Sequence, residues 1–368
     1  MLKILIQPLL VLLALAGCGT ENRPSQQSPD QAIGYQAGYR IISFVDSSRR
    51  YRPQVEQSNP LYYRPIDIDL WYPAQKNAHD STMRFGQFLK TLQERANFYS
   101  APQVFDSLST IISRSFCEAF SCSQPELVLQ HPTATVDQAK PAAGKFPLII
   151  YLASFGSMGY ENYLLLESLA AQGYIVACVN SIGRYPGDMT MKNGDLVQQV
   201  MDAEKILNRM KQDDRVDTSR IGVLGYSWGG FAGALLAMQR KDIRTIVSLD
   251  GSEVHHYGYC RTEDRDFDYT VNTPDFKNAA LSVTYLRLES NPEPGRTKKD
   301  SAYHFLSKVS GLKRVVKIDS AGHQDFSCLP WVVRASGKCP LPKVHSSISA
   351  LTISHFDQHL KNGAEKPK

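Results

Sequence analysis

The sequence has no marked excess of charge of one sign. Its 368 residues carry a formal net charge of +5, and the basic residues are scattered along the chain. Nucleic-acid-binding domains usually gather Lys and Arg into a patch or stripe, so we expect no nucleic-acid partner. The sequence also lacks an internal repeat, which excludes a propeller or a solenoid of stacked units.

Cysteines are few, and none of their spacings forms a convincing metal site. His255, His256 and Cys260 lie close in the sequence, but we interpret them as a surface loop and not as zinc ligands. We therefore expect no metal ion, and the chemistry proposed below needs no organic cofactor. Cys178 lies in an apolar strand pattern and is expected to be a buried free thiol. Two pairs are near enough for local disulfides: Cys117 with Cys122, and Cys328 with Cys339.

A hydrophobic run of transmembrane length is missing at the N-terminus. Ile4 to Ala16 follows Lys3 and is too short to span a bilayer comfortably. The run ends in Leu15-Ala16-Gly17-Cys18, which resembles the lipobox of bacterial lipoproteins, where the cysteine is lipidated and becomes the new N-terminus. This resemblance implies a signal peptide over residues 1–17 and a lipid anchor, such as palmitate, on Cys18. The alternative is a plain signal peptide with an incidental cysteine.

The residues after the signal predict an exported protein held at a membrane. Residues 18–35 are rich in Ser, Gln, Pro and Asn and are expected to form a flexible tether. Gly19 is not the aspartate associated with retention in the inner membrane, so the resemblance favours the outer membrane where the cell has one. Residues 36–368 are expected to form one α/β domain, which is large but allowed for an enzyme with an insertion.

Strand and helix patterns alternate over most of this domain. They predict a mostly parallel, doubly wound sheet. Ile66 to Pro73 alternates apolar and polar residues, which predicts a half-buried antiparallel strand near the edge of the sheet. The further strands are expected at Tyr39–Val45, Phe146–Leu152, Tyr174–Val179, Arg220–Leu224, Ile243–Leu249, Ala280–Leu288 and Lys313–Ile318, with helices at Glu161–Gln172, Asp195–Lys211, Gly230–Met238 and Ser346–Leu360.

An insertion at about residues 81–140 interrupts this alternation. Met83 to Asn97 and Pro102 to Phe116 have Phe, Leu and Ile at roughly helical spacing. A helical insertion between early strands is either a lid or acyl-pocket wall over the catalytic face, or a decoration away from the site. The sequence does not decide between these two placements.

Gly225-Tyr226-Ser227-Trp228-Gly229 is the stretch around which the domain is organised. It reads G-x-S-x-G, with an apolar strand before it and a run of small, helical residues after it. In a nucleophile elbow the serine sits on a sharp strand-to-helix turn, and glycine at both flanks lets the strand and the helix approach closely. Ser227 is therefore the predicted nucleophile.

A serine nucleophile needs a histidine base, and the base needs a carboxylate to orient it. In this fold the histidine is expected in a loop after the last strand, and His323 lies there, after Gly322. Two carboxylates end strands that follow the elbow: Asp250 in Leu249-Asp250-Gly251 and Glu289 in Leu288-Glu289-Ser290. The ends of parallel strands are where ligands bind in open α/β sheets, so the residues alone allow either acid.

Four segments together resemble the plasma-type platelet-activating-factor acetylhydrolase group. These are α/β-hydrolases related to the dienelactone-hydrolase-like esterases. The segments are Pro147–Gly173, the elbow, Leu249-Asp250, and Gly322-His323-Gln324-Asp325-Phe326. The resemblance implies the α/β-hydrolase fold and a triad of Ser227, Asp250 and His323, with Glu289 as the alternative acid.

The predicted oxyanion hole combines two backbone N–H groups. One belongs to Trp228, directly after the nucleophile, and the resemblance places the other on Phe155. The family usually has His-Gly before this second donor, where this chain has Ala153-Ser154. Backbone donors tolerate a change of side chain, but the departure puts the geometry of this loop in question.

These residues predict a serine hydrolase of carboxylic esters that works through an acyl-enzyme. The resemblance implies phospholipid or short acyl esters as substrates, and hence a role in lipid degradation. The alternatives are a polyester- or cutin-type hydrolase and an acetyl-carbohydrate esterase. A peptidase is less favoured, because no gating domain is apparent. From another class, the chain could be an inactive binding lipoprotein on the same scaffold, against which the order of serine, acid and histidine argues.

Overall fold

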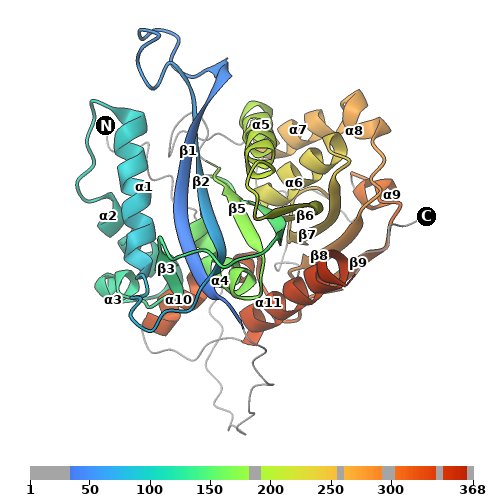
Figure 1. Ribbon diagram of the computed structural model, residues 1–368. Coiled ribbons are helices and arrows are strands. Elements are labelled where there is room, and N and C mark those ends of the chain that lie inside the picture. Colours follow the sequence, from blue (N-terminus) through green and yellow to red (C-terminus); the bar gives the residue numbers. More distant parts are fainter. Residues whose placement is uncertain (1–33, 182–191, 255–260, 292–302, 337–342, 363–368) are drawn as a thin grey trace, which may run out of the picture.

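A mixed sheet of nine strands runs through the described part of the chain (Figure 1). The computed structural model describes residues 34–181, 192–254, 261–291, 303–336 and 343–362. The strand order is β3-β1-β2-β5-β4-β6-β7-β8-β9. Strand β2 runs antiparallel to both of its neighbours, and the other pairs are parallel. The strands are β1 (Gln36–Arg50), β2 (Tyr63–Ala74), β3 (Thr135–Asp137), β4 (Phe146–Leu152), β5 (Ile175–Val179), β6 (Val216–Tyr226), β7 (Ile243–Leu249), β8 (Thr284–Glu289) and β9 (Lys313–Lys317).

Helices cover both faces of this sheet and form two hydrophobic cores. One core lies under α1 (Phe85–Ser100), α4 (Tyr163–Ala171), α10 (Leu329–Ser336) and α11 (Lys343–Phe356). The other lies under α5 (Asn193–Met210), α6 (Trp228–Gln239), α7 (Arg261–Val271), α8 (Pro274–Asn278) and α9 (Phe305–Lys308). The central strands are buried on both faces, as continuous apolar runs require. The predicted doubly wound, mostly parallel sheet is therefore confirmed.

Strand β2 is antiparallel as predicted and is third from one end of the sheet, but its predicted half-buried state is wrong. It lies inside the sheet, between β1 and β5, and most of it is buried. The polar positions of its alternating pattern do not face water. Asp69 accepts hydrogen bonds from both terminal nitrogens of Arg95, at 2.9 Å each, and from the hydroxyl of Tyr39. A polar residue can occupy this buried position of the strand because Arg95 of the insertion pairs with the Asp69 carboxylate.

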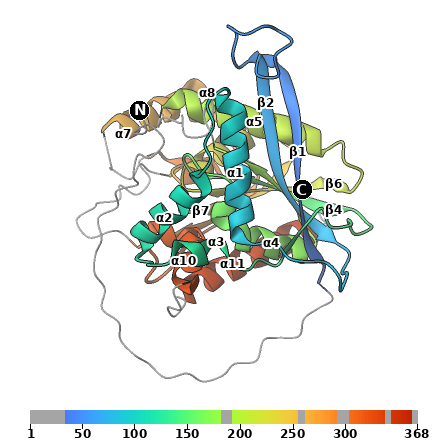
Figure 2. The same cartoon turned by 90° about the vertical axis from the view of Figure 1, so that its left-hand side faces the viewer.

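The insertion contains α1, α2 (Leu108–Phe120) and α3 (Pro125–Leu129), and it covers the β1–β2 end of the sheet (Figure 2). Phe88 of α1 packs on Tyr39 and Trp71, with ring centroids 5.3 and 5.7 Å apart. Phe85 and Phe116 contact the ring of Tyr160 in the 3-10 helix η1 (Gly159–Asn162). Helices α2 and α3 pack against α10. The insertion thus reaches the two segments that follow the β4 loop and the His323 loop.

The cysteines that the structure describes are all free thiols. Cys178 is buried, as predicted. The predicted disulfide of Cys117 with Cys122 is absent. Cys117 lies in the last turn of α2, and its carbonyl accepts the N–H of Cys122 at 2.8 Å. The two residues are therefore close because this hydrogen bond closes the end of the helix. Cys328 is a buried free thiol, and its predicted partner Cys339 lies outside the described residues, as do Cys18 and Cys260.

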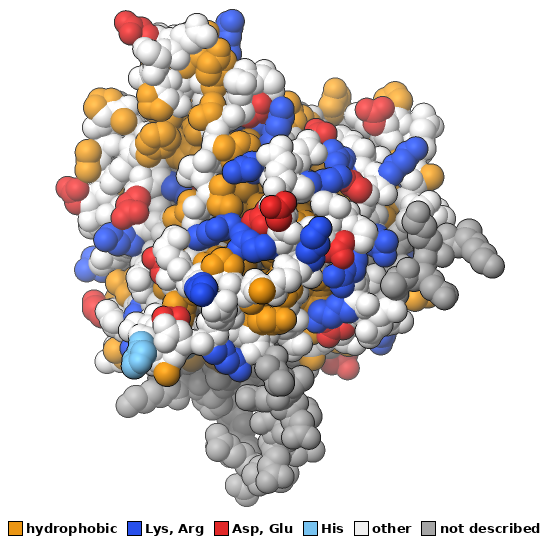
Figure 3. All heavy atoms as spheres, in the orientation of Figure 1, with side chains coloured by type: hydrophobic (Ala, Val, Ile, Leu, Met, Phe, Trp, Pro, Cys, Tyr) orange, Lys and Arg blue, Asp and Glu red, His pale blue; other side chains and the backbone are white. Residues whose placement is uncertain are grey.

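Basic and acidic side chains are interspersed on the face shown in Figure 3. Several of them form ion pairs at the surface, such as Arg215 with Asp213 at 2.6 Å and Arg240 with Asp242 at 2.8 Å. None of the helices within the described ranges has the length and the apolar character needed to cross a bilayer.

Candidate active site

Ser227 lies in a sharp turn between β6 and α6. Its backbone has φ 54° and ψ −120°, a conformation that non-glycine residues seldom adopt outside functional sites. The N–H of Ser227 donates to the carbonyl of Leu249 in β7, at 3.0 Å, which holds the turn to the sheet. A Cβ on Gly225 would lie 2.4 Å from the carbonyl oxygen of Gly229. The turn therefore has the form that the G-x-S-x-G pattern predicts.

Gly229→Ala is expected to destabilise the protein and to lower its turnover. A Cβ at this position would lie 2.0 Å from the carbonyl oxygen of Leu152, so β4 and α6 would have to separate. Overpacking of this kind typically costs about 1–3 kcal/mol, and it would displace the loop after Leu152. Thermal unfolding followed by circular dichroism measures the first effect, and kcat the second. Gly194→Ala in α5 is the control, because nothing lies within 4 Å of its Cβ, and it should change neither quantity appreciably.

His323 contacts both Ser227 and Asp250. Its Nε2 lies 2.9 Å from the hydroxyl oxygen of Ser227, and its Nδ1 lies 2.8 Å from Oδ2 of Asp250. A carboxylate only accepts hydrogen bonds, so Nδ1 carries the proton and Nε2 is left as the acceptor for the serine hydroxyl. The hydroxyl of Tyr226 donates to the carbonyl of His323 at 3.1 Å, which ties the histidine loop to the elbow strand.

Asp250 is fully buried at the end of β7. Its φ is 45°, another strained backbone conformation for a residue with a side chain. The second carboxylate oxygen, Oδ1, accepts the N–H of Ser290 at 2.9 Å, and the N–H of Asp250 donates to Leu288 at 2.8 Å. These bonds come from the end of β8 and from the loop after it, and they leave Oδ2 directed at His323.

Glu289, the other predicted acid, has a different partner. Its Oε1 accepts a hydrogen bond from Nε of Arg287 at 2.6 Å. Arg287 is itself completely buried, and its Nη1 donates to Gly251 at 2.7 Å and to Glu253 at 3.0 Å. Of the two candidate acids, the structure therefore brings Asp250 to the histidine and places Glu289 in an ion pair with Arg287.

The two predicted oxyanion donors belong to residues whose side chains contact each other. Trp228 is the first residue of α6, so its N–H has no carbonyl partner one turn earlier in the helix. Phe155 follows β4, and within the described residues its N–H donates to no other group. The rings of Phe155 and Trp228 are 5.8 Å apart, which places the two loops beside each other. The arrangement supplies two N–H groups near Ser227.

No other described histidine forms a hydrogen bond with Ser227. His355 Nε2 lies 2.7 Å from the hydroxyl of Thr245, and burial, with smaller contributions from His359 and Arg314, lowers the pKa of His355 to about 3. His345 contacts Trp331. His255, His256 and Cys260 lie outside the described residues, and no group of metal-binding side chains occurs among the residues that are described.

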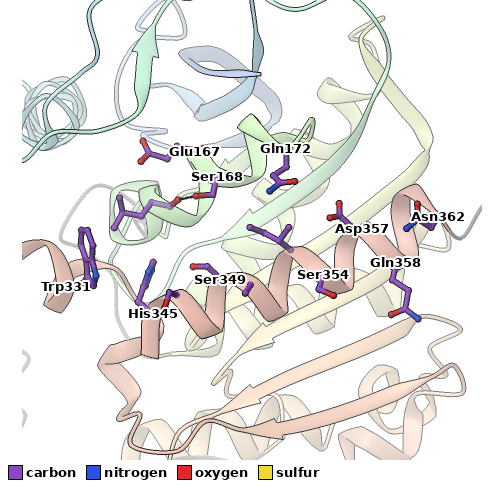
Figure 4. A pocket seen from close by; sticks show the side chains of 14 residues that line it. Glu167, Ser168, Gln172, Trp331, His345, Ser349, Ser354, Asp357, Gln358 and Asn362 are labelled. Atoms are coloured by element: carbon purple, nitrogen blue, oxygen red, sulfur yellow. Dashed lines mark hydrogen bonds between the residues drawn. The ribbon is translucent and has the colours of Figure 1, made fainter. Parts of the chain in front are cut away.

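A groove of about 780 Å³ between α4 and α11 is separate from these residues (Figure 4). Trp331 and His345 lie at one end and Gln172 and Asn362 at the other. None of the predicted site residues lines it. This groove is therefore not where the serine, histidine and aspartate meet.

The sequence interpretation missed two charged residues around the site. Arg287 stands in the apolar strand Tyr285–Glu289, and a charge inside such a run was the available signal. Glu161 was only the first residue of the predicted helix Glu161–Gln172 and was given no role. It lies instead in η1, is 2% exposed, and accepts hydrogen bonds from the loop that carries Phe155.

The chain is similar to serine peptidases over part of its length. A family model described as X-Pro dipeptidyl-peptidase (S15 family) matches residues 102–265. Dipeptidyl peptidase 8 of Homo sapiens is 24% identical over 199 residues, which are 48% of this chain and 21% of that protein. The protein of the same name from Mus musculus is 26% identical over 117 residues, 28% of this chain and 13% of the relative. The chain thus spans about a fifth or less of these curated relatives.

A solved structure of low sequence identity has the same fold along almost the whole chain. The ferulic acid esterase of Streptomyces cinnamoneus superimposes with a TM-score of 0.59 at 19% identity, over 92% of this chain and 94% of the esterase. The acylaminoacyl peptidase of Pyrococcus horikoshii matches 61% of this chain and 39% of its own, with a TM-score of 0.46 and 15% identity. The near-complete overlap with the esterase shows that the chain has the α/β-hydrolase fold.

Proposed function

We propose that this protein, a serine hydrolase of the α/β-hydrolase fold, cleaves carboxylic esters with a triad of Ser227, His323 and Asp250. The observation that carries the proposal is the pair of contacts made by His323, at 2.9 Å to the serine hydroxyl and at 2.8 Å to the aspartate. The three residues come from three separate loops at the ends of strands, where ligands bind in sheets of this type.

The geometry supports acyl transfer in two steps. His323 takes the proton of the Ser227 hydroxyl as its oxygen attacks the ester carbonyl, and Asp250 stabilises the resulting imidazolium. The N–H groups of Phe155 and Trp228 hold the oxyanion of the tetrahedral intermediate. His323 then gives its proton to the leaving alcohol, and water, deprotonated by the same histidine, releases the acid from Ser227.

An ester is favoured over a peptide bond by the overlap with an esterase along almost the whole chain. The match to the X-Pro dipeptidyl-peptidase family favours the second candidate, cleavage after an Xaa-Pro dipeptide. That match covers residues 102–265, which include Ser227 and Asp250 but not His323. Both reactions use the same triad, so the two functions are distinguished by comparing the rates on an ester substrate and on an Xaa-Pro substrate.

Purified protein is expected to react with a fluorophosphonate at Ser227 and to hydrolyse short p-nitrophenyl esters faster than an Xaa-Pro p-nitroanilide. Mass spectrometry locates the adduct, and initial rates compare kcat/KM for the two substrates. A panel of esters with increasing acyl length then separates short acyl esters from phospholipid-like and polyester-like ones, and acetylated sugars test the carbohydrate alternative. A higher kcat/KM for the anilide would favour the peptidase. If Ser227 of the folded protein does not react with the fluorophosphonate, the enzyme hypothesis is wrong. The remaining hypothesis is then a binding protein without catalytic activity.

We further propose that Cys18 carries a lipid anchor and that the enzyme acts at a membrane surface. The lipobox pattern of Leu15 to Cys18 supports this localisation. Cys18→Ser is expected to move the protein from the membrane fraction to the soluble fraction of the cell envelope, because the anchoring thiol is lost. Immunoblots of fractionated cells measure this change. A Cys18→Ser protein that still sediments with membranes would contradict the anchor.

A further inference from the structure

We propose that Glu161 is a positioning residue for the oxyanion hole. Through Ser154 it fixes the loop after β4 so that the next N–H, that of Phe155, is available to the oxyanion. This inference rests on the proposed function, since it assigns a role in the same acyl transfer. It also accounts for the loop in which Ala153-Ser154 departs from the expected pattern.

The side chain of Glu161 accepts several hydrogen bonds from this loop and from the strand before it. Its Oε1 accepts the N–H of Ser154 and the hydroxyl of Tyr151, both at 2.7 Å. Its Oε2 accepts the hydroxyl of Ser154. Asn162 donates to the Tyr151 oxygen at 3.1 Å, which orients that hydroxyl toward the carboxylate. Ser154 is therefore held through both its backbone and its side chain.

Glu161 is buried without a cationic partner. It is 2% exposed, and within the described ranges no Lys, Arg or His forms an ion pair with it. Burial raises the pKa of this carboxyl, and hydrogen bonds from Ser154, Tyr151 and Ser157 oppose that rise. Burying an unpaired carboxyl is costly in any fold. A carboxylate that only accepts hydrogen bonds is the group that suits a position surrounded by these donors.

The bond to Ser154 determines which loop N–H faces the serine. Because the Ser154 N–H is used by Glu161, the first N–H after β4 that can reach an oxyanion is that of Phe155. Ala153 is fixed as well, since its carbonyl accepts Nε2 of the buried Gln199 at 2.9 Å. The peptide groups just before Phe155 are thus held from both sides. Oxyanion catalysis depends on donors that are in place before the reaction.

Glu161 also connects this loop to the histidine loop. Its backbone carbonyl accepts the N–H of Cys328 at 2.8 Å. Cys328 closely follows η2 (His323–Phe326), whose start is closed by Asp325 accepting the N–H of Gly322 at 2.9 Å. One residue therefore contacts the segments that carry the proposed base and the proposed oxyanion donor.

The test compares three substitutions with a matched control. Glu161→Ala removes all the side-chain acceptors, Glu161→Gln keeps the shape and an acceptor oxygen, and Ser154→Ala removes the hydroxyl but keeps the N–H. Glu167→Ala is the control. Glu167 lies in α4 and is also a buried carboxylate, which accepts hydrogen bonds from the N–H of Ala134 and the hydroxyl of Thr135, but it lines the groove of Figure 4. The readouts are kcat and KM on p-nitrophenyl acetate and the second-order rate of phosphonylation of Ser227 by a fluorophosphonate.

Glu161→Ala is expected to lower kcat and the phosphonylation rate by about 100-fold, the order found for loss of one oxyanion donor, with KM changed less than about 3-fold. Glu161→Gln should recover most of this loss, and Ser154→Ala should lose less than Glu161→Ala. Glu167→Ala should change kcat less than about 3-fold.

If Glu161→Ala and Glu167→Ala lower kcat and the phosphonylation rate equally, at a temperature where both variants are folded, the inference is wrong. If Glu161→Ala does not fold, Glu161→Asp replaces it, because the shorter side chain withdraws the carboxylate from the Ser154 N–H. An unchanged phosphonylation rate in folded Glu161→Asp would overturn the inference as well. Phosphonylation tests the loop independently of whether the natural substrate is an ester. A wild-type protein that is phosphonylated but inactive on esters contradicts only the proposed ester specificity. A wild-type Ser227 that never reacts contradicts both proposals.

Discussion

Ser227→Ala and His323→Ala are each expected to lower kcat on a short p-nitrophenyl ester by on the order of 10⁶-fold, the size found when a member of such a triad is removed. Without the hydroxyl no acyl-enzyme can form, and without the imidazole the hydroxyl keeps its proton. The contacts at 2.9 and 2.8 Å join the three residues into one unit, so the Ser227→Ala/His323→Ala double variant should lose little more than either single variant.

Initial rates with the purified variants, checked for folding by circular dichroism, measure this effect. His304→Ala is the control, because His304 is exposed and begins the short helix α9. A His323→Ala variant with kcat within about 10-fold of wild type would mean that another group acts as the base. Losses that simply add in the double variant would mean that the two residues do not act as a unit.

Asp250→Asn is expected to lower kcat by about 10⁴-fold, whereas Glu289→Gln should leave it within about 10-fold of wild type. Asparagine offers an NH₂ group to Nδ1 of His323, which favours the tautomer that carries its proton on Nε2 and cannot accept one from Ser227. Glu289 accepts from Arg287, and an amide oxygen keeps that acceptor. Both substitutions replace a carboxylate by an amide of the same size, so each is the control for the other.

The measurement is kcat across a range of pH for the two variants. Asp250→Asn should recover some activity at alkaline pH, where hydroxide assists deprotonation of the serine. A large loss in Glu289→Gln with little change in Asp250→Asn would assign the acid to Glu289 and would require His323 to turn away from the geometry seen here.

The sequence predicted the sheet and the elbow well, because both depend on local patterns. A strand buried on both faces must be apolar throughout, and a strand-to-helix turn as tight as that at Ser227 needs glycine on either side. His323 was predictable for a similar reason: it follows the last strand and a glycine. Ser227 and His323 each follow a strand directly or after a short loop, so the order of strands along the chain is enough to locate them.

Other features were not predictable, because they depend on residues distant in the chain. In the sequence, Asp69 and Arg95 look like surface residues. Both are buried in the structure because the insertion packs over β2 and brings them together. Asp250 and Glu289 both end strands, and only the fold shows that His323 contacts Asp250 whereas Glu289 pairs with Arg287. Glu161 has the spacing of an exposed helical residue, and only the fold of the β4 loop around its carboxylate gives it buried partners.

The ion pair of Arg95 with Asp69 limits how the insertion can move. Swinging α1 outward would separate Arg95 from Asp69 and would expose the apolar side chains with which this helix packs on the sheet. We infer that the insertion stays packed on β2 during turnover. An enzyme of this kind has no opening step for a lipid surface to trigger, and its rate should follow the concentration of accessible ester without a threshold.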